Sequence, residues 1–244
     1  MLLQLVPNAE AARFCLPYEP FCALAADIIS RAPPLASLRK LSFSSVSNDR
    51  FLLLDQANPI MRLAPNLEAL HFDRCGAVTN LFSASLGRNS PADPPPLSKL
   101  TELSLADSQL SVASLAALLN SVGPRLSKFK IRRSSPTLSF SDVLTVLQPW
   151  KGTLRELIIF NSHEALLSEP IGSVAGILLL REFHALETLC VEATDLEFLE
   201  YLSRQPGVSS LLPPSLRNLR LRGDPRRITA IMRNPLVALN ARKY

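Results

Sequence analysis

The hydrophobic positions of this chain follow one short pattern that recurs with a nearly constant period. The pattern is a large apolar residue, two variable positions, a second apolar residue, one variable position and a third apolar residue. Its period is on the order of 30 residues, which is the scale of a repeat architecture. A degraded first copy has Ala9, Ala12 and Phe14 at the three positions. Seven clear copies begin at Leu38, Leu67, Leu100, Leu126, Leu154, Leu186 and Leu216. We therefore expect eight repeat units.

The second half of each copy predicts a short β-strand. Its two apolar residues alternate with a variable residue, so they lie on one face of a strand while the variable residue points to the other face. Parallel pairing of consecutive strands needs a return connection of a dozen or more residues, and a period of this length provides one. The pattern thus indicates an α/β stack in which each repeat packs on its neighbours.

The segments between strands contain signals for helices. In the clearest one, Ser111 is expected to cap a helix whose apolar residues recur at helical spacing up to Val122, and Gly123 and Pro124 end it. Further helix starts are predicted at Ser141 or Asp142, at Thr79 or Asn80, and at Asp195. Proline before several strands ends the preceding helix, because the residue before proline disfavours the α conformation.

The copy that begins at Leu67 carries a more specific motif. Residues 67–79 read L-x-x-L-x-F-x-x-C-x-x-V-T, with Cys75 at the cysteine position. This segment resembles the leucine-rich repeat family, in particular the long-repeat subclass of ribonuclease inhibitor and F-box/LRR proteins, and the resemblance covers nearly the whole chain. At the position of Cys75 the other copies have Val46, Ser108, Ser134, Ser162, Thr194 and Asp224.

The resemblance implies an α/β leucine-rich repeat solenoid, or horseshoe, with parallel strands on the concave face and helices on the convex face. Residues 1–244 would form a single domain of about eight repeat units. The implied function is protein binding on the concave face, with substrate recognition for an SCF-type ubiquitin ligase as its particular form. No F-box is visible before the first repeat. The chain is therefore predicted either to be truncated at its N-terminus or to belong to a protein that never had an F-box. A ubiquitin ligase adaptor is a partner only if a missing F-box lies upstream.

Charge adds an alternative to this interpretation. The net charge of +5 is uneven, because residues 1–122 hold 9 basic and 10 acidic side chains whereas residues 123–244 hold 17 and 11. A basic half can form an electrostatic scaffold or bind nucleic acid. Nucleic acid is the less favoured partner, because stacking platforms need exposed aromatic rings and only Phe160 qualifies as one. A non-functional gene fragment is the third alternative.

Other classes of function find little support in the sequence. The three histidines, His71, His163 and His184, lie in different repeats, and there is no glycine-rich phosphate loop or HExxH motif. We therefore expect a non-enzymatic protein without cofactor or metal. No apolar run of about 18 residues is present, which argues against a membrane span. Without a secretory signal or CxxC motif, the four cysteines are expected to be free thiols in a cytoplasmic or nuclear protein.

Candidate binding residues lie on the strand positions that point away from the core. One repeat holds four basic residues, and Ile158 with Phe160 follows on the next strand. An apolar centre bordered by arginine matches the composition of energetically important interface residues. The alternative is that Phe160 packs against its neighbours and the basic side chains are only solvated. The predicted partner-binding set is Lys128, Lys130, Arg132, Arg133, Glu156, Ile158, Phe160, Asn161, Arg220 and Arg222.

Overall fold

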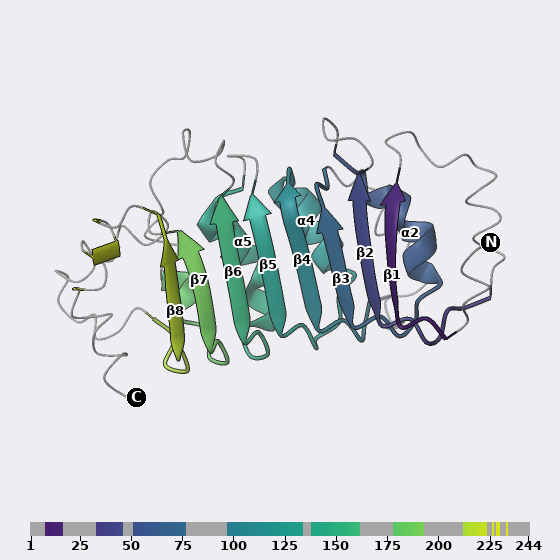
Figure 1. Cartoon of the computed structure of the whole chain (residues 1–244). Helices are drawn as coiled ribbons and strands as arrows, with labels where there is room; N and C mark the ends of the chain where they lie inside the picture. Colours follow the sequence, from purple (N-terminus) through teal and green to yellow (C-terminus); the bar gives the residue numbers. More distant parts are fainter. Residues whose placement is uncertain are drawn as a thin grey trace. The chain divides into compact units, whose positions relative to one another are not determined.

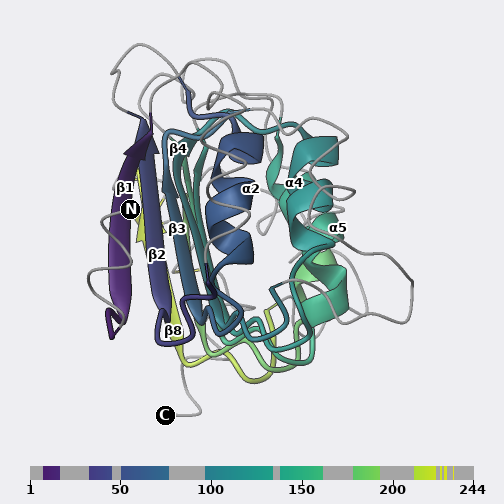
Figure 2. The ribbon, with the colours of Figure 1, turned by 90° about the vertical axis from the view of Figure 1, so that its right-hand side faces the viewer.

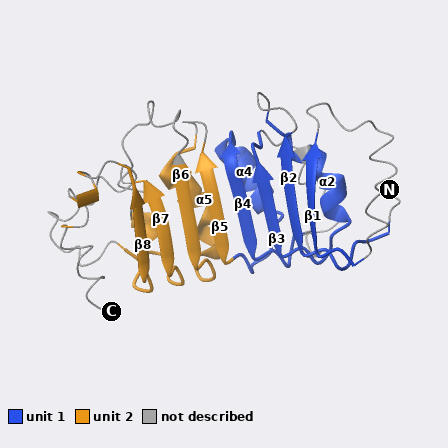
Figure 3. Ribbon diagram, viewed as in Figure 1, with its two compact units in different colours: residues 1–126 blue, residues 127–244 orange. Residues whose placement is uncertain are grey.

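The structure is a computed structural model in which the chain divides into two compact units, residues 1–126 and 127–244 (Figure 3). Each unit contains four of the eight predicted strands, and each is described separately below. The residues that the structure describes are 8–16, 33–45, 51–76, 97–133, 138–161, 178–192, 212–223, 226, 228, 229 and 233. The helix starts predicted near residues 79 and 195 lie outside them.

Unit 1 is built on four parallel strands that pair in chain order (Figure 1). The strands are β1 (Ala11–Leu16), β2 (Lys40–Ser45), β3 (Ala69–Asp73) and β4 (Glu102–Ser108). The register joins equivalent repeat positions, since Ala12 lies beside Leu41, Leu41 beside Leu70, and Leu70 beside Leu103. The degraded first copy is therefore confirmed as a structural repeat.

Unit 2 repeats the same plan. Its strands are β5 (Lys128–Arg133), β6 (Glu156–Asn161), β7 (Thr188–Glu192) and β8 (Asn218–Arg222), again parallel and in chain order. Phe129 lies beside Leu157, and Leu157 beside Leu189, so the apolar positions of successive copies form continuous rows. The repeat found in the sequence is thus the structural unit of both halves.

Helices cover one side of the strands in each unit (Figure 2). Unit 1 has α2 (Leu54–Arg62) and α4 (Val112–Leu119), and unit 2 has α5 (Phe140–Leu147), which continues into the short 3-10 helix η2 (Gln148–Trp150). The opposite side of the strands carries the variable residues of each copy, and we call it the outward face. None of these helices lies on the outward face.

The N-terminal caps of α4 and α5 can be compared with the caps predicted from the sequence. Ser111 caps α4 as predicted, because its side chain accepts a hydrogen bond from the backbone N–H of Ser114. The prediction for α5 is wrong, since its cap is Ser139 and not Ser141 or Asp142. Ser139 and Asp142 form a capping box, in which each side chain bonds the backbone N–H of the other residue.

The core of each unit lies between the strands and the helices. In unit 1 three phenylalanines from successive repeats stack along it: Phe14 on Phe43 with ring centroids 5.8 Å apart, and Phe43 on Phe72 with centroids 5.3 Å apart. At the second pattern position, Leu41, Leu70 and Leu103 are buried in unit 1, as are Phe129, Leu157 and Leu189 in unit 2, whereas Leu219 on the last strand is half-buried. Since each repeat buries its apolar residues only against its neighbours, the stack supplies the core that one repeat lacks.

One backbone position, in the last residues of the strand or directly after it, differs between repeats. Arg74, Asp107 and Gly223 occupy equivalent positions, and all three have a positive φ, of 60°, 46° and 119°. After Arg74 and Asp107 this conformation resets the alternation, so the next side chain turns inward. Cys75 and Ser108 are buried in this way, and their side chains lie 2.9 Å apart. The cysteine position of the motif is therefore an interior position.

The burial of Cys75 predicts a dependence of stability on pH. Desolvation raises the pKa of its thiol from 9.0 to about 12 in the folded state. In the unfolded chain the thiol ionises near pH 9, so thiolate formation favours unfolding, and the stabilisation present below pH 9 is lost as the pH rises towards 12. Urea unfolding at pH 8, 9.5 and 10.5 should show a steeper loss of stability for the wild type than for Cys75→Ser.

The slope difference should approach about 1.4 kcal/mol per pH unit, the limit for one proton. Cys15→Ser is the matched control, because Cys15 has the same side chain at an exposed position. If the wild type and Cys75→Ser lose stability with pH in parallel, the Cys75 thiol ionises as readily in the folded chain as in the unfolded chain, and the prediction is wrong.

Candidate protein-binding surface

The predicted binding residues gather on the outward face of unit 2, formed by β5 to β8. Because the strands pair in register, their variable residues align in rows that run across the strands. The middle row contains Lys130, Ile158, Cys190 and Arg220. The rows on either side of it begin with Lys128 beside Glu156 and with Arg132 beside Phe160.

Ile158 and Phe160 form the apolar centre of this face. Both side chains are half-buried, although they project away from the core on β6. The guanidinium of Arg222, on β8, lies over the Phe160 ring at 4.4 Å from the ring centroid. That distance is within the range of a cation–π interaction, which contributes about 0.5–1 kcal/mol at exposed sites. The structure therefore brings together the aromatic and basic residues that the sequence marked as candidates.

Basic side chains flank the apolar centre on both sides. On β5, Lys128 and Arg132 are exposed and Lys130 is half-buried, and on β8 both Arg220 and Arg222 are exposed. Lys128 forms an ion pair with Glu156, with 3.7 Å between Nζ and Oε2. Both partners remain in contact with solvent, so the pair contributes at most about 1 kcal/mol. The positive charge thus lies at the two edges of the surface.

Two side chains of β7 complete the surface and were missing from the predicted set. Cys190 and Glu192 point outward but are only 7% and 5% exposed. Burial raises the pKa of the Cys190 thiol, an effect that the nearby positive charges of Arg220 and Arg222 partly counter. The strand register identifies them. Cys190 lies between Ile158 and Arg220 on neighbouring strands, and Glu192 lies beside Arg222 in the register of β7 and β8.

One residue of the predicted set is misplaced. Arg133 is fully buried, so the expectation that it belongs to the exposed surface is wrong. It keeps an extended strand backbone, and alternation from Phe129 and Ile131 therefore turns it inward. There its Nη1 donates a hydrogen bond to the backbone oxygen of Leu138 at 3.0 Å. Asn161 ends β6, and its side chain lies outside the described part of the structure.

The outward face of unit 1 provides a contrast within the same chain. Its strand positions carry mostly small or neutral side chains, such as Ser42, Ala69 and Ser104. The described charges on it balance, with Arg13 and Lys40 against Asp73 and Glu102. These outward strand positions contain no large aliphatic or aromatic side chain. The combination of an apolar centre and basic flanks therefore distinguishes unit 2.

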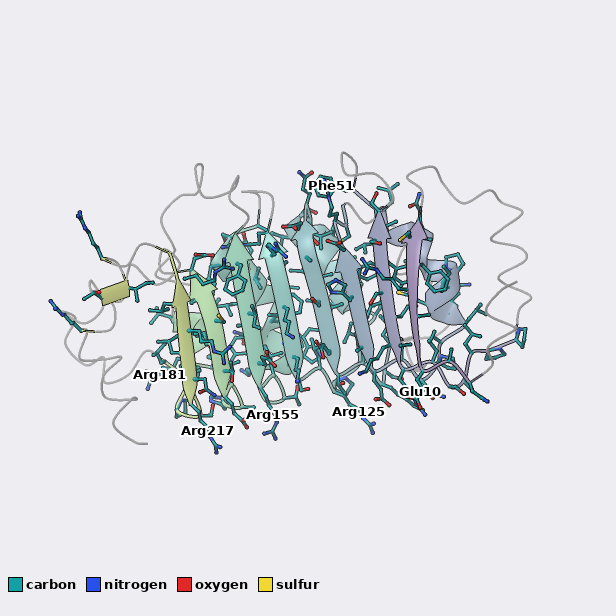
Figure 4. All side chains as sticks on the ribbon, in the orientation of Figure 1. Glu10, Phe51, Arg125, Arg155, Arg181 and Arg217 are labelled. Atoms are coloured by element: carbon teal, nitrogen blue, oxygen red, sulfur yellow. The ribbon has the colours of Figure 1, made fainter. Side chains whose placement is uncertain are left out.

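Part of the basic excess of unit 2 lies elsewhere, at the edge where the strands begin. Figure 4 shows Arg155 and Arg217 projecting from this edge. Arg155 forms an ion pair with Glu187, and nearby Lys151 forms one with Glu182. Acidic partners therefore offset the charges of Arg155 and Lys151 at this edge.

The described residues offer little to other kinds of site. They contain no group of three His, Cys, Asp or Glu side chains placed to hold a metal ion. The helices among them are too short, or not apolar enough, to cross a membrane. The cysteines that the structure describes, Cys15, Cys75 and Cys190, are free thiols.

Comparison with known proteins gives distant structural likenesses. No protein-family model matches the chain, and no curated protein matches it in sequence. An internalin from Listeria monocytogenes is 16% identical over 94% of this chain and 67% of its own, with a TM-score of 0.39. The leucine-rich repeat-containing protein LegL7 from Legionella pneumophila is 11% identical over 94% of this chain and 91% of its own, with a TM-score of 0.32.

Likenesses this remote concern the arrangement of strands and helices and say nothing of ligands. The class of the protein follows from its own repeats: eight copies of one apolar pattern, eight strands that are parallel within each unit, and helices on one side of them. It is an α/β leucine-rich repeat solenoid. The assignment to the long-repeat subclass stays a prediction.

Proposed function

We propose that this chain is a non-enzymatic protein-binding module and that the outward face of unit 2 contacts its partner. The observation that carries the proposal is the Phe160 ring on β6, half-buried beside Ile158 and covered on one side by the Arg222 guanidinium. Aromatic and arginine side chains at the centre of a contact contribute most to protein–protein affinity. A face with this composition gains free energy when a partner removes the remaining apolar area from water.

The test is affinity capture with the purified chain from a lysate of its native cells. Phe160→Asp puts a charge into the apolar centre, and we expect it to abolish capture of the specific partner, because a desolvated carboxylate would face an apolar contact. Ser42→Asp introduces the same charge on the outward face of unit 1 and is the matched control. Proteins that wild type and control retain and Phe160→Asp loses are identified by mass spectrometry.

Folding must be separated from binding in this comparison. Circular dichroism and thermal melting of each variant report whether the solenoid is intact, and Phe160→Ala supplies a milder second variant. Equal capture by the wild type and by a folded Phe160→Asp protein would contradict the proposal. So would loss of capture with Ser42→Asp to the same extent.

A finer proposal is that the bound protein is a substrate held for an SCF-type ubiquitin ligase in the cytoplasm or nucleus. The repeat resemblance is its support, through the motif around Cys75 and the interior position of that residue. The test is immunoprecipitation of the native protein from its cells, in which any segment upstream of this chain is also present, and ligase subunits should then accompany the Phe160-dependent partner. A Phe160-dependent partner recovered in this way without any ligase subunit would leave the binding function and remove the ligase role.

A further inference from the structure

We propose that the outward face of unit 2 binds an extended acidic segment of its partner that lies across the strands. In this segment an acidic residue, a large apolar residue and a second acidic residue occupy alternate positions. The inference rests on the proposed function, because it requires this face to be the binding surface. It adds the chemistry of the ligand, which the repeat fold alone leaves open.

The spacing of the strands sets the spacing of the ligand. Neighbouring strands lie about 4.8 Å apart, so the three intervals from β5 to β8 span about 14 Å. An extended peptide advances about 3.4 Å per residue, and three side chains on one of its faces, at alternate positions, cover about 14 Å as well. The basic residues of β5 and β8 thus lie under the two outer side chains, and the middle one falls between β6 and β7, next to Ile158 and Phe160.

The charges of the face complement such a ligand. Five basic side chains stand against two acidic ones among the described outward positions, and the acidic pair is formed by Glu156 and Glu192. Lys130 and Arg132 flank the apolar centre on β5, and Arg220 and Arg222 flank it on β8. Arg222 is already held over the Phe160 ring, so less side-chain entropy is lost when its guanidinium meets a carboxylate.

The same observations argue against nucleic acid as the ligand. Stacking of successive bases needs several exposed aromatic rings, whereas the described outward positions of unit 2 offer Phe160 alone, and Arg222 covers one face of its ring. Glu156 lies inside the basic surface and would repel a phosphate chain that crosses it. An alternating peptide reduces this repulsion, because the side chain that it places between its two acidic residues is apolar and uncharged.

The experiment selects ligands from a displayed library of random twelve-residue peptides with the whole chain as bait. We expect the pattern acid, any residue, large apolar, any residue, acid to be enriched about tenfold over the unselected library. The bound peptides should be lost with Phe160→Asp and kept with Ser42→Asp. Enriched peptides that depend on Phe160 but show no excess of acidic residues at the two outer positions would overturn the inference and leave the proposed function intact.

A charge reversal tests the local contact with one selected peptide. Arg220→Glu is expected to weaken its binding at least about tenfold, because a basic flank becomes repulsive. Arg217→Glu is the matched control, since it makes the same change of net charge on the edge beside β8 and should change affinity less than about twofold. Equal weakening by the two variants would mean that only the overall charge attracts the peptide, and would overturn the inference.

Two further measurements separate the remaining outcomes. A peptide with lysine in place of the acidic residue that faces β8 should recover binding to Arg220→Glu, and failure of this exchange counts against the proposed pairing. A single-stranded oligonucleotide of 20 thymidines is the competitor that represents nucleic acid. If it binds at physiological salt and no peptide depends on Phe160, both the inference and the proposed function are wrong.

Discussion

Replacement of Phe72 by alanine is expected to lower the free energy of unfolding by about 3–5 kcal/mol, the usual cost of removing a buried aromatic side chain. The Phe72 side chain is completely buried, and its ring stacks on that of Phe43 with an interplanar angle of 16°. Truncation therefore removes apolar burial, leaves a cavity, and breaks a stack that joins three repeats. Urea unfolding followed by circular dichroism measures the loss.

Ser104→Ala is the control for this prediction. Ser104 lies on β4 beside His71, the residue that precedes Phe72 on β3. Its side chain is on the outward face and not in the core. Its replacement should change stability by no more than about 0.5 kcal/mol, as expected for a surface position. A loss below about 1 kcal/mol for Phe72→Ala would show that the core of unit 1 collapses into the vacated space.

The second large effect is expected at Gly123, which follows α4. A Cβ atom added at this position would lie 2.6 Å from both the Cα and the carbonyl oxygen of Ser98. These are backbone atoms, and the segments are joined by a hydrogen bond from the Gly123 N–H to the Leu97 oxygen, so neither can move away cheaply. We expect Gly123→Ala to destabilise the chain by about 1–3 kcal/mol, as overpacking does.

Gly152→Ala provides the comparison, because a Cβ atom at Gly152 would meet no heavy atom within 4 Å. This variant should be neutral or more stable by about 0.4–1 kcal/mol, since alanine restricts the unfolded chain. Thermal and urea unfolding should therefore show a loss of stability for Gly123→Ala and no loss for Gly152→Ala. A neutral Gly123→Ala protein would mean that the two segments separate without cost.

The repeat architecture could be predicted because it depends on a signal that recurs in every copy. The alternation of apolar residues and the nearly constant period define both the strands and their order. The helices were harder to place. The start of α2 has no side-chain cap at Leu53, and Pro59 lies inside the helix, so the usual signals of a helix are absent there. For α5 the sequence predicts a cap at Ser141 or Asp142, directly before the apolar run, whereas the cap is Ser139 and Asp142 occupies the third helical position.

The candidate surface was predictable only in part. Alternation places Ile158 and Phe160 outward, and the structure agrees. Arg133 was assigned by its charge, although its extended backbone turns it inward where the left-handed residues Arg74 and Asp107 reset the alternation. The approach of Arg222 to Phe160 depends on the lateral register of strands that lie two repeats apart in the sequence, for which no local pattern exists.

Because the register of the strands is constant, changes in the connecting segments and changes at the variable strand positions have separate effects on the outward face. Lys40 pairs with Ala69, Ala69 with Glu102, and Lys128 with Glu156, and the connecting segments differ in length, yet the same repeat positions meet each time. Insertions and deletions in the connections therefore leave the outward rows aligned. Duplication of one repeat would widen the face by one strand, about 4.8 Å, while substitutions at the variable strand positions alter its chemistry. Such a chain can change the length of its connections without changing the surface that meets its ligand.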